Sequence, residues 1–296
     1  MHDQLVRLMT NDGAIRASAA NTTNLVGQIC KLQHTDPTAS VTLGRVTTAV
    51  CLMGGLLKGS QRMALSVEGN GPLQKIQAET DAYGSVRATI KEPQCGLPPK
   101  DGNYDVANAI GKAGFLHVTK DLGLKEPYRA TVQLTSSEVA EDIANYYAVS
   151  EQIPTMIALG VTLKSNADVA ASGGFLVQAM PGCSEETLKN IETRLGAMPA
   201  VSTQLRAGQT PMIILEQLLG EIAFTLQTDY ELNFRCNCSR PYVLQMLRGL
   251  TQGELDGLAK GDEDTVVTCE YCRKQYQITA EEIDVILQEG QEIKKV

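Results

Sequence analysis

The feature that most constrains the fold of this chain is a set of four cysteines in two close pairs near its C-terminal end. Cys236 and Cys238 have one residue between them, Cys269 and Cys272 have two, and 30 residues separate the pairs. Two close pairs joined by a moderate loop are typical of zinc sites, because Zn²⁺ accepts four thiolates in a tetrahedron. The chain has three histidines, and none lies near the pairs in the sequence. The pattern therefore predicts one Zn²⁺ ion bound by these four cysteines.

The C-x-C pair is poorly suited to a stable disulfide. An extended residue spans about 3.3–3.6 Å, so the Cα atoms of Cys236 and Cys238 would lie roughly 6.6–7.2 Å apart. That separation is at or beyond the upper edge of disulfide geometry, about 4.4–6.8 Å, so a disulfide here needs a bent backbone and carries strain. Strained disulfides are readily reduced and are often regulatory. In a zinc site with Zn–S bonds near 2.3 Å, neighbouring sulfurs lie only about 3.8 Å apart, so the metal would hold dithiols close together.

The residues around the pairs bear on whether these thiolates react. Four basic residues flank them: Arg235, Arg240, Arg273 and Lys274. Exposed thiolates beside cations react with peroxide to give sulfenic acids, which condense to disulfides. Alternatively, the basic residues form an ordinary solvated surface and the zinc only folds its domain. If zinc supplies much of the folding free energy, its loss would unfold the small domain and expose apolar surface that binds other proteins.

Charge and hydropathy exclude several classes of partner. The net charge is −8, and residues 232–296 carry eight Lys/Arg against eleven Asp/Glu. This acidic balance argues against nucleic acids and anionic membranes as partners. The longest apolar stretch, residues 49–57, is too short to span a bilayer, and the first residues lack the apolar core of a signal peptide. We therefore expect a cytoplasmic protein.

The remaining cysteines are interpreted as structural. In a cytoplasmic protein, eight cysteines should be mostly reduced or metal-bound rather than joined in stable disulfides. The four outside the pairs are scattered singly along the chain, and small buried apolar positions are the usual environment of such cysteines. These residues are Cys30, Cys51, Cys95 and Cys183.

Turn signals and alternating residues in residues 1–181 predict an α+β core domain built on antiparallel strands. Asn11, Asp12 and Gly13 form a hairpin signal between residues 4–10 and 14–20. A buried helix is predicted over residues 37–59, and a helix over residues 139–150 would begin with a capping box formed by Thr135 and Glu138. Further predicted strands, of which the first three form a meander, cover residues 62–69, 73–80, 84–90, 128–135, 155–163 and 173–182.

The sequence changes character after residue 181. Residues 182–231 predict a helical linker with helices over 183–198 and 210–224, the second capped by Thr210 before Pro211. Residues 232–296 predict the zinc-binding domain, because about 65 residues form an insecure core unless a metal cross-links them. We expect the linker to pack against this domain. The predicted elements of the domain are helices over 241–249 and 251–261, strands over 265–268 and 274–278, and a last helix with a capping box formed by Thr279 and Glu282.

The sequence gives little support for an enzyme. It contains neither a nucleotide-binding glycine signature nor a nucleophile elbow, and His117 is more readily interpreted as a strand residue than as a base. The C-x-x-C pair is followed by a strand-like segment rather than by the βαβ pattern of thioredoxin-like oxidoreductases. Two alternatives to a redox switch stay open at this point: a constitutive binding protein with a purely structural zinc module, and an enzyme of the hydrolase or oxidoreductase class.

Several segments together resemble one known family. FRCNCSR and CEYCRKQY, with 30 residues between their cysteine pairs, resemble the zinc and redox centre of the redox-regulated holdase chaperones of the heat shock protein 33 family. The resemblance extends to TASVTLGRVTTAVCLMGGLLKG, VEGNGPL, VTKDLGLKEPY and GGFLVQAMPG, and so to nearly the whole chain. No cysteine of the family motif is missing.

The resemblance implies a cytoplasmic chaperone that is not an enzyme and that is inactive when reduced and zinc-bound. Peroxide combined with unfolding stress, or hypochlorous acid, would activate it. Cys269 and Cys272 would form the first disulfide with loss of zinc, and Cys236 and Cys238 would form the second. The linker would then unfold, a homodimer would form, and unfolding client proteins would be bound without ATP and kept from aggregating.

Overall fold

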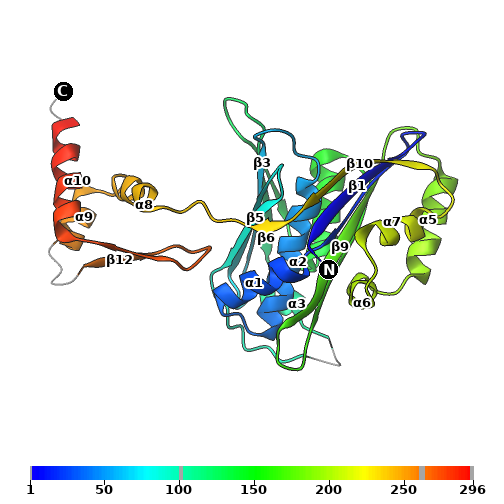
Figure 1. The fold of residues 1–296 in the computed structure, drawn as a ribbon, viewed down its shortest axis with the longest axis horizontal. Helices are drawn as coiled ribbons and strands as arrows, with labels where there is room; N and C mark the ends of the chain where they lie inside the picture. The colour runs from blue at the N-terminus through cyan, green and yellow to red at the C-terminus, as the bar shows by residue number, and fades with distance from the viewer. Residues whose placement is uncertain (1, 100–102, 260–263, 294–296) are drawn as a thin grey trace. The chain divides into compact units, whose positions relative to one another are not determined.

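The computed structural model describes residues 2–99, 103–259 and 264–293, with side chains as far as residue 288. The chain forms two compact units, Met1–Arg235 and Cys236–Val296 (Figure 1). The described part of the first unit has two β-sheets with helices between and beside them, and that of the second has helices and a short two-stranded sheet. This architecture is the α+β fold that the sequence predicts, with a small four-cysteine unit at the C-terminal end.

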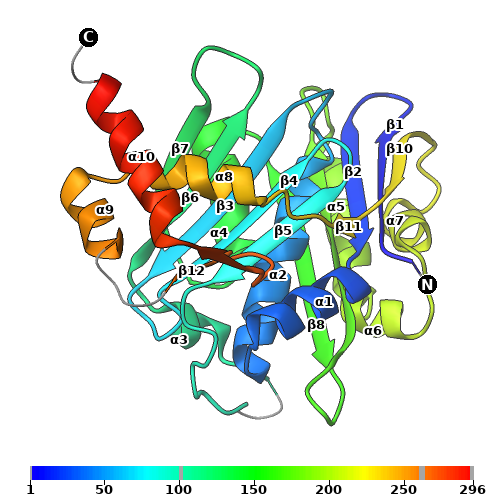
Figure 2. The ribbon, with the colours of Figure 1, turned by 60° about the vertical axis from the view of Figure 1, so that its left-hand side comes forward.

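A six-stranded sheet forms one layer of the first unit (Figure 2). In their order across the sheet, its strands are β11 (Asn233–Phe234), β5 (Ser85–Ile90), β4 (Lys75–Asp81), β3 (Arg62–Gly69), β6 (Gly114–Asp121) and β7 (Tyr128–Gln133). The meander of the first three predicted strands is confirmed, because β3 pairs with β4 and β4 with β5, all antiparallel. The short strand β11 instead pairs parallel with β5.

A five-stranded antiparallel sheet forms a second layer. Its strands, in order, are β10 (Phe224–Glu231), β1 (Gln4–Thr10), β2 (Ile15–Asn21), β9 (Val169–Ala179) and β8 (Thr155–Leu163). The predicted hairpin is confirmed: β1 pairs with β2 from Gln4↔Asn21 to Met9↔Arg16, and Gly13 adopts a positive φ of 72° in the turn. Glycine adopts such a conformation without the steric cost that a Cβ atom would bring.

Helix α2 (Pro37–Gly54) lies between the two sheets and contacts strands of both (Figure 1). Asp36 caps it by accepting a hydrogen bond from the backbone N–H of Ala39 at 2.8 Å. Every residue from 38 to 54 except Arg45 is buried, which is the pattern of a core helix. The other helical segments on this side are α1 (Thr23–Gln33), α3 (Val106–Ile110), α4 (Val139–Tyr146) and the π-helical turn η1 (Tyr147–Glu151). The predicted buried helix is thus confirmed, although it ends at Gly54 rather than at residue 59.

The predicted capping box before α4 is wrong. Helix α4 begins at Val139 with Glu138 as its N-cap, and the Glu138 side chain makes no capping hydrogen bond. Glu138 forms an ion pair with Arg45 of α2 instead. Thr135 donates its hydroxyl to Asp142 at 3.0 Å. Contacts with side chains elsewhere in the fold therefore replace the local pairing that the sequence spacing suggested.

Residues 182–231 contain the two predicted helices and two elements that were not predicted. The predicted helices are α5 (Glu185–Ala197) and α7 (Pro211–Leu219), and the short helix α6 (Val201–Arg206) between them was not predicted. Thr210 caps α7 as predicted, accepting a hydrogen bond from the N–H of Ile213 at 3.3 Å. Residues 224–231 are not helical, however, because they form β10 and pair antiparallel with β1 over its whole length. Strand β1 is more than 200 positions away in the sequence, so a pattern of neighbouring residues could not predict this pairing.

Helices α5 to α7 cover the face of the five-stranded sheet that is turned away from α2 (Figure 1). Ile191 of α5 and Leu215 and Leu218 of α7 are buried in one apolar cluster with residues of the sheet, among them Val6 and Phe175. We expected this segment to pack against the C-terminal domain. Its apolar residues instead pack against the five-stranded sheet of the first unit.

The second unit is small. Its elements are α8 (Arg240–Leu247), α9 (Gln252–Ala259), β12 (Thr265–Thr268), β13 (Gln275–Ile278) and α10 (Ala280–Ile293). The capping box before α10 is confirmed, because the Thr279 N–H donates to Glu282 at 3.0 Å and the Glu282 N–H donates to the Thr279 hydroxyl at 3.3 Å. Residues 260 and 261, at the end of the predicted helix over 251–261, lie outside the described residues. The apolar cluster of the unit comprises Val243, Leu247, Leu255, Tyr276, Ile278, Ile283 and Ile286.

Across the ranges that the structure describes, each helix is either too short or too polar to cross a membrane.

The glycines of α2 and α5 provide a matched test of how tightly the first unit is packed. A Cβ atom on Gly44 of α2 would lie 2.8 Å from a methyl group of Val26 and 2.9 Å from one of Val161, whereas Gly196 of α5 has no atom within 4 Å of that position. We predict that Gly44→Ala destabilises the protein by about 1–3 kcal/mol through overpacking. We expect Gly196→Ala to stabilise it by up to about 1 kcal/mol through helix propensity. Urea unfolding followed by circular dichroism measures both, and a stabilising Gly44→Ala would contradict this packing.

Candidate metal centre

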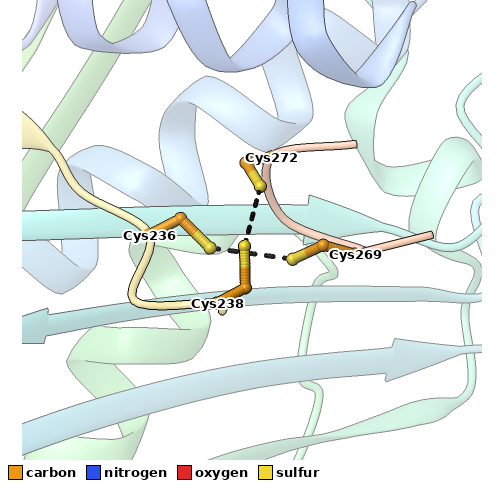
Figure 3. A group of neighbouring side chains, drawn as sticks. All are labelled: Cys236, Cys238, Cys269 and Cys272. Carbon is orange, nitrogen blue, oxygen red and sulfur yellow. Dashed lines mark hydrogen bonds between the residues drawn. The ribbon is translucent and has the colours of Figure 1, made fainter. Parts of the chain in front are cut away.

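The structure brings the four predicted cysteines into one cluster within the second unit. Cys236 and Cys238 lie on the extended segment before α8, and Cys269 and Cys272 lie in the turn that joins β12 to β13. All four are partly buried, and their Sγ atoms all lie within 4.8 Å of one another. Figure 3 shows the two segments facing each other, with the four sulfur atoms directed into the space between them.

The turn that carries the C-x-x-C pair is held by its own backbone. The N–H of Cys269 donates to the carbonyl of Lys274 at 2.9 Å, and the N–H of Arg273 donates to the carbonyl of Cys269 at 2.9 Å. Arg273 has a φ of 60°, a conformation that most non-glycine residues avoid. The hairpin of β12 and β13 sets the ends of this turn, from Thr268↔Gln275 onward. The turn thereby presents both thiols on one side.

The C-x-C pair is joined to the same hairpin by a side chain. Arg240, at the start of α8, pairs with Glu282 at 2.6 Å and donates to the carbonyl of Gln277 at 2.7 Å. Ser239 caps α8 by accepting from the N–H of Tyr242 at 3.4 Å. We expected Arg240 to be one of the cations that could activate the thiols. Its guanidinium group instead binds Glu282 and the carbonyl of Gln277, and so joins the C-x-C segment to the end of β13 and the start of α10.

The sulfur–sulfur distances fit a tetrahedral metal site in the reduced state. Two sulfur–sulfur contacts join the pairs, Cys236 with Cys269 at 3.6 Å and Cys238 with Cys272 at 3.3 Å. These distances exceed an S–S bond of about 2.05 Å, and all eight cysteines are free. They approach the spacing of about 3.8 Å expected between thiolates on one Zn²⁺ ion. Four sulfur donors in this arrangement suit a borderline-soft divalent ion.

The four thiols differ in how readily they ionise. Burial raises the pKa of Cys236, and it raises the pKa of Cys272 to about 12. Burial also opposes ionisation of Cys238, but hydrogen bonds to its sulfur from the Tyr276 hydroxyl and from neighbouring thiols outweigh this effect and lower its pKa to about 7. One thiolate thus forms readily, whereas four neighbouring thiolates require a cation among them.

Sequence reasoning missed Tyr276, whose side chain contacts a sulfur of this centre directly. Its hydroxyl donates to Sγ of Cys238 at 3.2 Å. That hydrogen bond raises the pKa of the Tyr276 hydroxyl to about 12, so the group stays protonated and acts as the donor. Strand alternation contains a signal that could have identified it, because Tyr276 and Ile278 are the two buried residues of β13.

The four remaining cysteines and His117 lie in the first unit. Cys30 and Cys51 are buried, as predicted, and burial raises the pKa of each thiol. The prediction is wrong for Cys95 and Cys183, which are only partly buried. Cys95 lies beside the carboxylate of Asp36, at 3.4 Å. His117 is a strand residue of β6, as predicted, and its Nδ1 lies 2.9 Å from the hydroxyl of Thr131.

Comparison with known proteins gives one consistent result. The family model described as Hsp33 protein matches residues 3–279. The chain is 52% identical over 287 residues to the 33 kDa chaperonin of Syntrophotalea carbinolica, covering 97% of this chain and 100% of that protein. It is 48% identical to the 33 kDa chaperonin of Geobacter sulfurreducens, covering 95% and 94% of the two chains. The crystal structure of the 33 kDa chaperonin (heat shock protein 33 homologue) of Thermotoga maritima superposes with a TM-score of 0.90 at 31% identity, covering 99% of this chain and 100% of that one.

The cluster predicts binding of one divalent metal ion per chain. Titration of the reduced protein with Co²⁺ should give the absorption of a tetrahedral cobalt thiolate and should saturate at one equivalent. Loss of an outer hydrogen-bonding partner alone typically costs about 10–100-fold in metal affinity, so Cys238→Ser, which removes a ligand, should cost more. Cys95→Ser, in the first unit, is the matched control and should bind Co²⁺ normally. Equal binding by both variants would contradict a metal site at the cluster.

Proposed function

Because the chain belongs to the Hsp33 family, we propose that it is a redox-regulated chaperone that binds unfolding proteins without ATP. It is inactive while the four cysteines are reduced and hold a metal, and oxidation of these cysteines activates it. The observation that carries this proposal is the cluster of four unbridged sulfurs, within 4.8 Å of one another, in a unit with a small apolar core. The same atoms that stabilise the unit are therefore the ones that an oxidant attacks.

The metal in this proposal is one Zn²⁺ ion held by Cys236, Cys238, Cys269 and Cys272. Four thiolates suit zinc because the ion is borderline-soft and prefers a tetrahedral site. When bound, it supplies the positive charge that lets four neighbouring thiolates coexist, and it cross-links the segment before α8 to the hairpin of β12 and β13. Binding energy of this kind is folding energy for a small domain.

The oxidative step consumes two thiolates and one molecule of hydrogen peroxide. One sulfur attacks a peroxide oxygen and becomes a sulfenic acid, and the second sulfur displaces the hydroxyl group from it. With two protons taken up, the products are one disulfide and two water molecules, and both electrons come from the two sulfurs. Each disulfide removes two donors from the metal, so the remaining sulfurs hold it less well. Repeating the step at the second pair completes the oxidation.

We assign the disulfides to Cys269–Cys272 and then Cys236–Cys238. The reduced structure offers a competing pairing, because close sulfur contacts join Cys236 to Cys269 at 3.6 Å and Cys238 to Cys272 at 3.3 Å. Adjacent pairing is favoured once the unit loosens, because loop closure costs more for cysteines 33 or 34 positions apart than for those two or three apart. Unfolding also allows the backbone bend that a C-x-C disulfide needs.

In this proposal, unfolding of the second unit is followed by unfolding of the linker, residues 182–231. The domains in this proposal are the core, residues 1–181, the linker, and the redox-switch domain, residues 232–296. The apolar faces of α5 and α7 lie against the five-stranded sheet, where Ile191, Leu215 and Phe175 are almost completely buried. Release of these helices would expose both apolar surfaces, and large exposed apolar patches bind other proteins. Unfolding client proteins, which expose apolar segments, fit such surfaces.

The proposed function also includes a compartment, an oligomeric state and a class of partner. A chaperone of this kind acts in the cytoplasm, where thiols are kept reduced until oxidants accumulate. Its active form is a homodimer, and it needs neither nucleic acid nor membrane as a partner. It holds its clients for later refolding and catalyses no reaction on them.

A constitutive binding protein with a structural metal is the second candidate. The Arg240–Glu282 ion pair and the apolar cluster around Tyr276 join the two halves of the unit without any metal. If these contacts suffice to keep the unit folded, the metal would be only one of several cross-links. This candidate predicts that oxidation leaves client binding unchanged.

Client binding should depend on oxidation of the chain. A chemically unfolded client protein is diluted into buffer that contains either the reduced, zinc-loaded chain or the chain treated with peroxide at mild heat. Light scattering measures aggregation of the client, and a chromogenic chelator measures the zinc released. We expect only the oxidised chain to suppress aggregation, in step with release of one zinc equivalent. A Cys95→Ser/Cys183→Ser double variant, which leaves the cluster intact, should behave like the unmodified chain. Equal suppression before and after oxidation, with zinc retained, would favour the constitutive candidate.

A separate prediction concerns the disulfides. Trypsin cuts after Arg235, Lys260 and Arg273, so each close pair stays within one peptide, and Lys260 separates the two pairs. After complete oxidation and alkylation, mass spectrometry should find each peptide two hydrogens lighter and not alkylated. A product in which the two peptides are covalently joined would show pairing across the motifs and would contradict the assignment.

A further inference from the structure

The hydrogen bond between Tyr276 and Cys238 makes the four sulfurs unequal. Tyr276 lies on β13, four residues after the C-x-x-C pair, yet its hydroxyl contacts a sulfur of the other pair, at 3.2 Å. A thiolate has no proton to donate, so the phenol must be the donor and the sulfur the acceptor. A donated hydrogen bond withdraws electron density from the sulfur. It therefore makes the thiolate a weaker nucleophile.

The position of the phenol is fixed by packing. Tyr276 is 6% exposed and belongs to the apolar cluster that also contains Val243 and Leu247 of α8. Its backbone is paired with Val267 across the hairpin. The ammonium group of Lys274 lies 5.2 Å from the centre of its ring. A cation over the ring draws electron density from it and makes the hydroxyl a stronger donor.

We propose that Tyr276 is a positioning residue that protects Cys238 from oxidation and so makes the C-x-C pair react more slowly than the C-x-x-C pair. This inference rests on the proposed redox function. Peroxide takes two electrons from each pair by the step given above, and Tyr276 changes only the rate at one sulfur. Tyr276 also links the two cysteine pairs, because it lies on β13, which follows Cys272, and its hydroxyl donates a hydrogen bond to Cys238.

The test compares two substitutions that each remove one hydroxyl group from the second unit. Tyr276→Phe keeps the ring in its apolar cluster and removes the donor to Cys238. Tyr242→Phe makes the same chemical change on α8, where the side chain is 55% exposed, and serves as the matched control. Both full-length variants are loaded with one equivalent of Zn²⁺, and circular dichroism confirms that they fold. They are then treated with peroxide at a fixed temperature, quenched with an alkylating reagent at intervals, and digested with trypsin to follow each pair separately.

We expect Tyr276→Phe to accelerate oxidation of the pair Cys236 and Cys238 by about threefold to tenfold, the factor that corresponds to a typical net hydrogen bond. The rate at Cys269 and Cys272, and both rates in Tyr242→Phe, should stay within about twofold of the unmodified chain, since neither change reaches those sulfurs. An unchanged rate at the C-x-C pair would overturn the proposal. Equal acceleration of both pairs would also overturn it, because that result indicates a general loosening of the unit.

A second variant keeps the proposal testable if Tyr276→Phe does not fold. Incorporation of 3-fluorotyrosine at position 276 keeps the ring and the hydroxyl and makes the hydroxyl a stronger donor. Oxidation of the C-x-C pair should then be slower than in the unmodified chain, and a faster or equal rate would overturn the proposal. If peroxide oxidises neither pair in the unmodified chain, the redox function itself fails, whereas normal oxidation with no effect at position 276 defeats only the role of Tyr276.

Discussion

Four sulfur atoms within 4.8 Å of one another cannot all carry negative charge unless a cation lies among them. This constraint limits the charge that the sulfurs of the second unit can carry. Without a cation, ionisation is favoured at Cys238 and opposed at Cys236 and Cys272. A cation bound by the four sulfurs would also join the segment before α8 to the turn between β12 and β13, in addition to the Arg240–Glu282 ion pair.

The two units differ in how much they depend on such a cross-link. The first unit has an extensive core in which α2 is buried between two sheets. The second unit has a small apolar cluster, supported by the Arg240–Glu282 pair and by the capping of α10. Small cores seldom supply much stability alone. The same loss of a cross-link would therefore have unequal effects on the two parts of the chain.

Local sequence patterns predicted the elements whose causes are local. The hairpin at Gly13 and the caps at Thr210 and Thr279 follow from spacings of a few residues, and so does each of the two cysteine pairs taken singly. The failures have distant partners. Strand β10 forms by pairing with β1, which is more than 200 positions away in the sequence. Glu138 forms an ion pair with Arg45 of α2 instead of the predicted capping box. Tyr276 acquires its role because the fold places β13 against the C-x-C segment, which no spacing within CEYCRKQY reveals.

The chain leaves the first unit along a path that is attached to both sheets in turn. Strand β10 pairs with β1 from Thr10↔Phe224 to Gln4↔Glu231, Leu232 donates to the carbonyl of Asp3 at 3.0 Å, and the two residues of β11 then pair with β5 just before Cys236. The pairing with β5 involves only the two residues of β11, whereas the pairing with β1 involves the whole of that strand. A chain loosened from the cysteine end would therefore lose the short contact with one sheet before the long contact with the other. The segment that leads to the cysteines is thus held at two places of unequal length, in two different sheets.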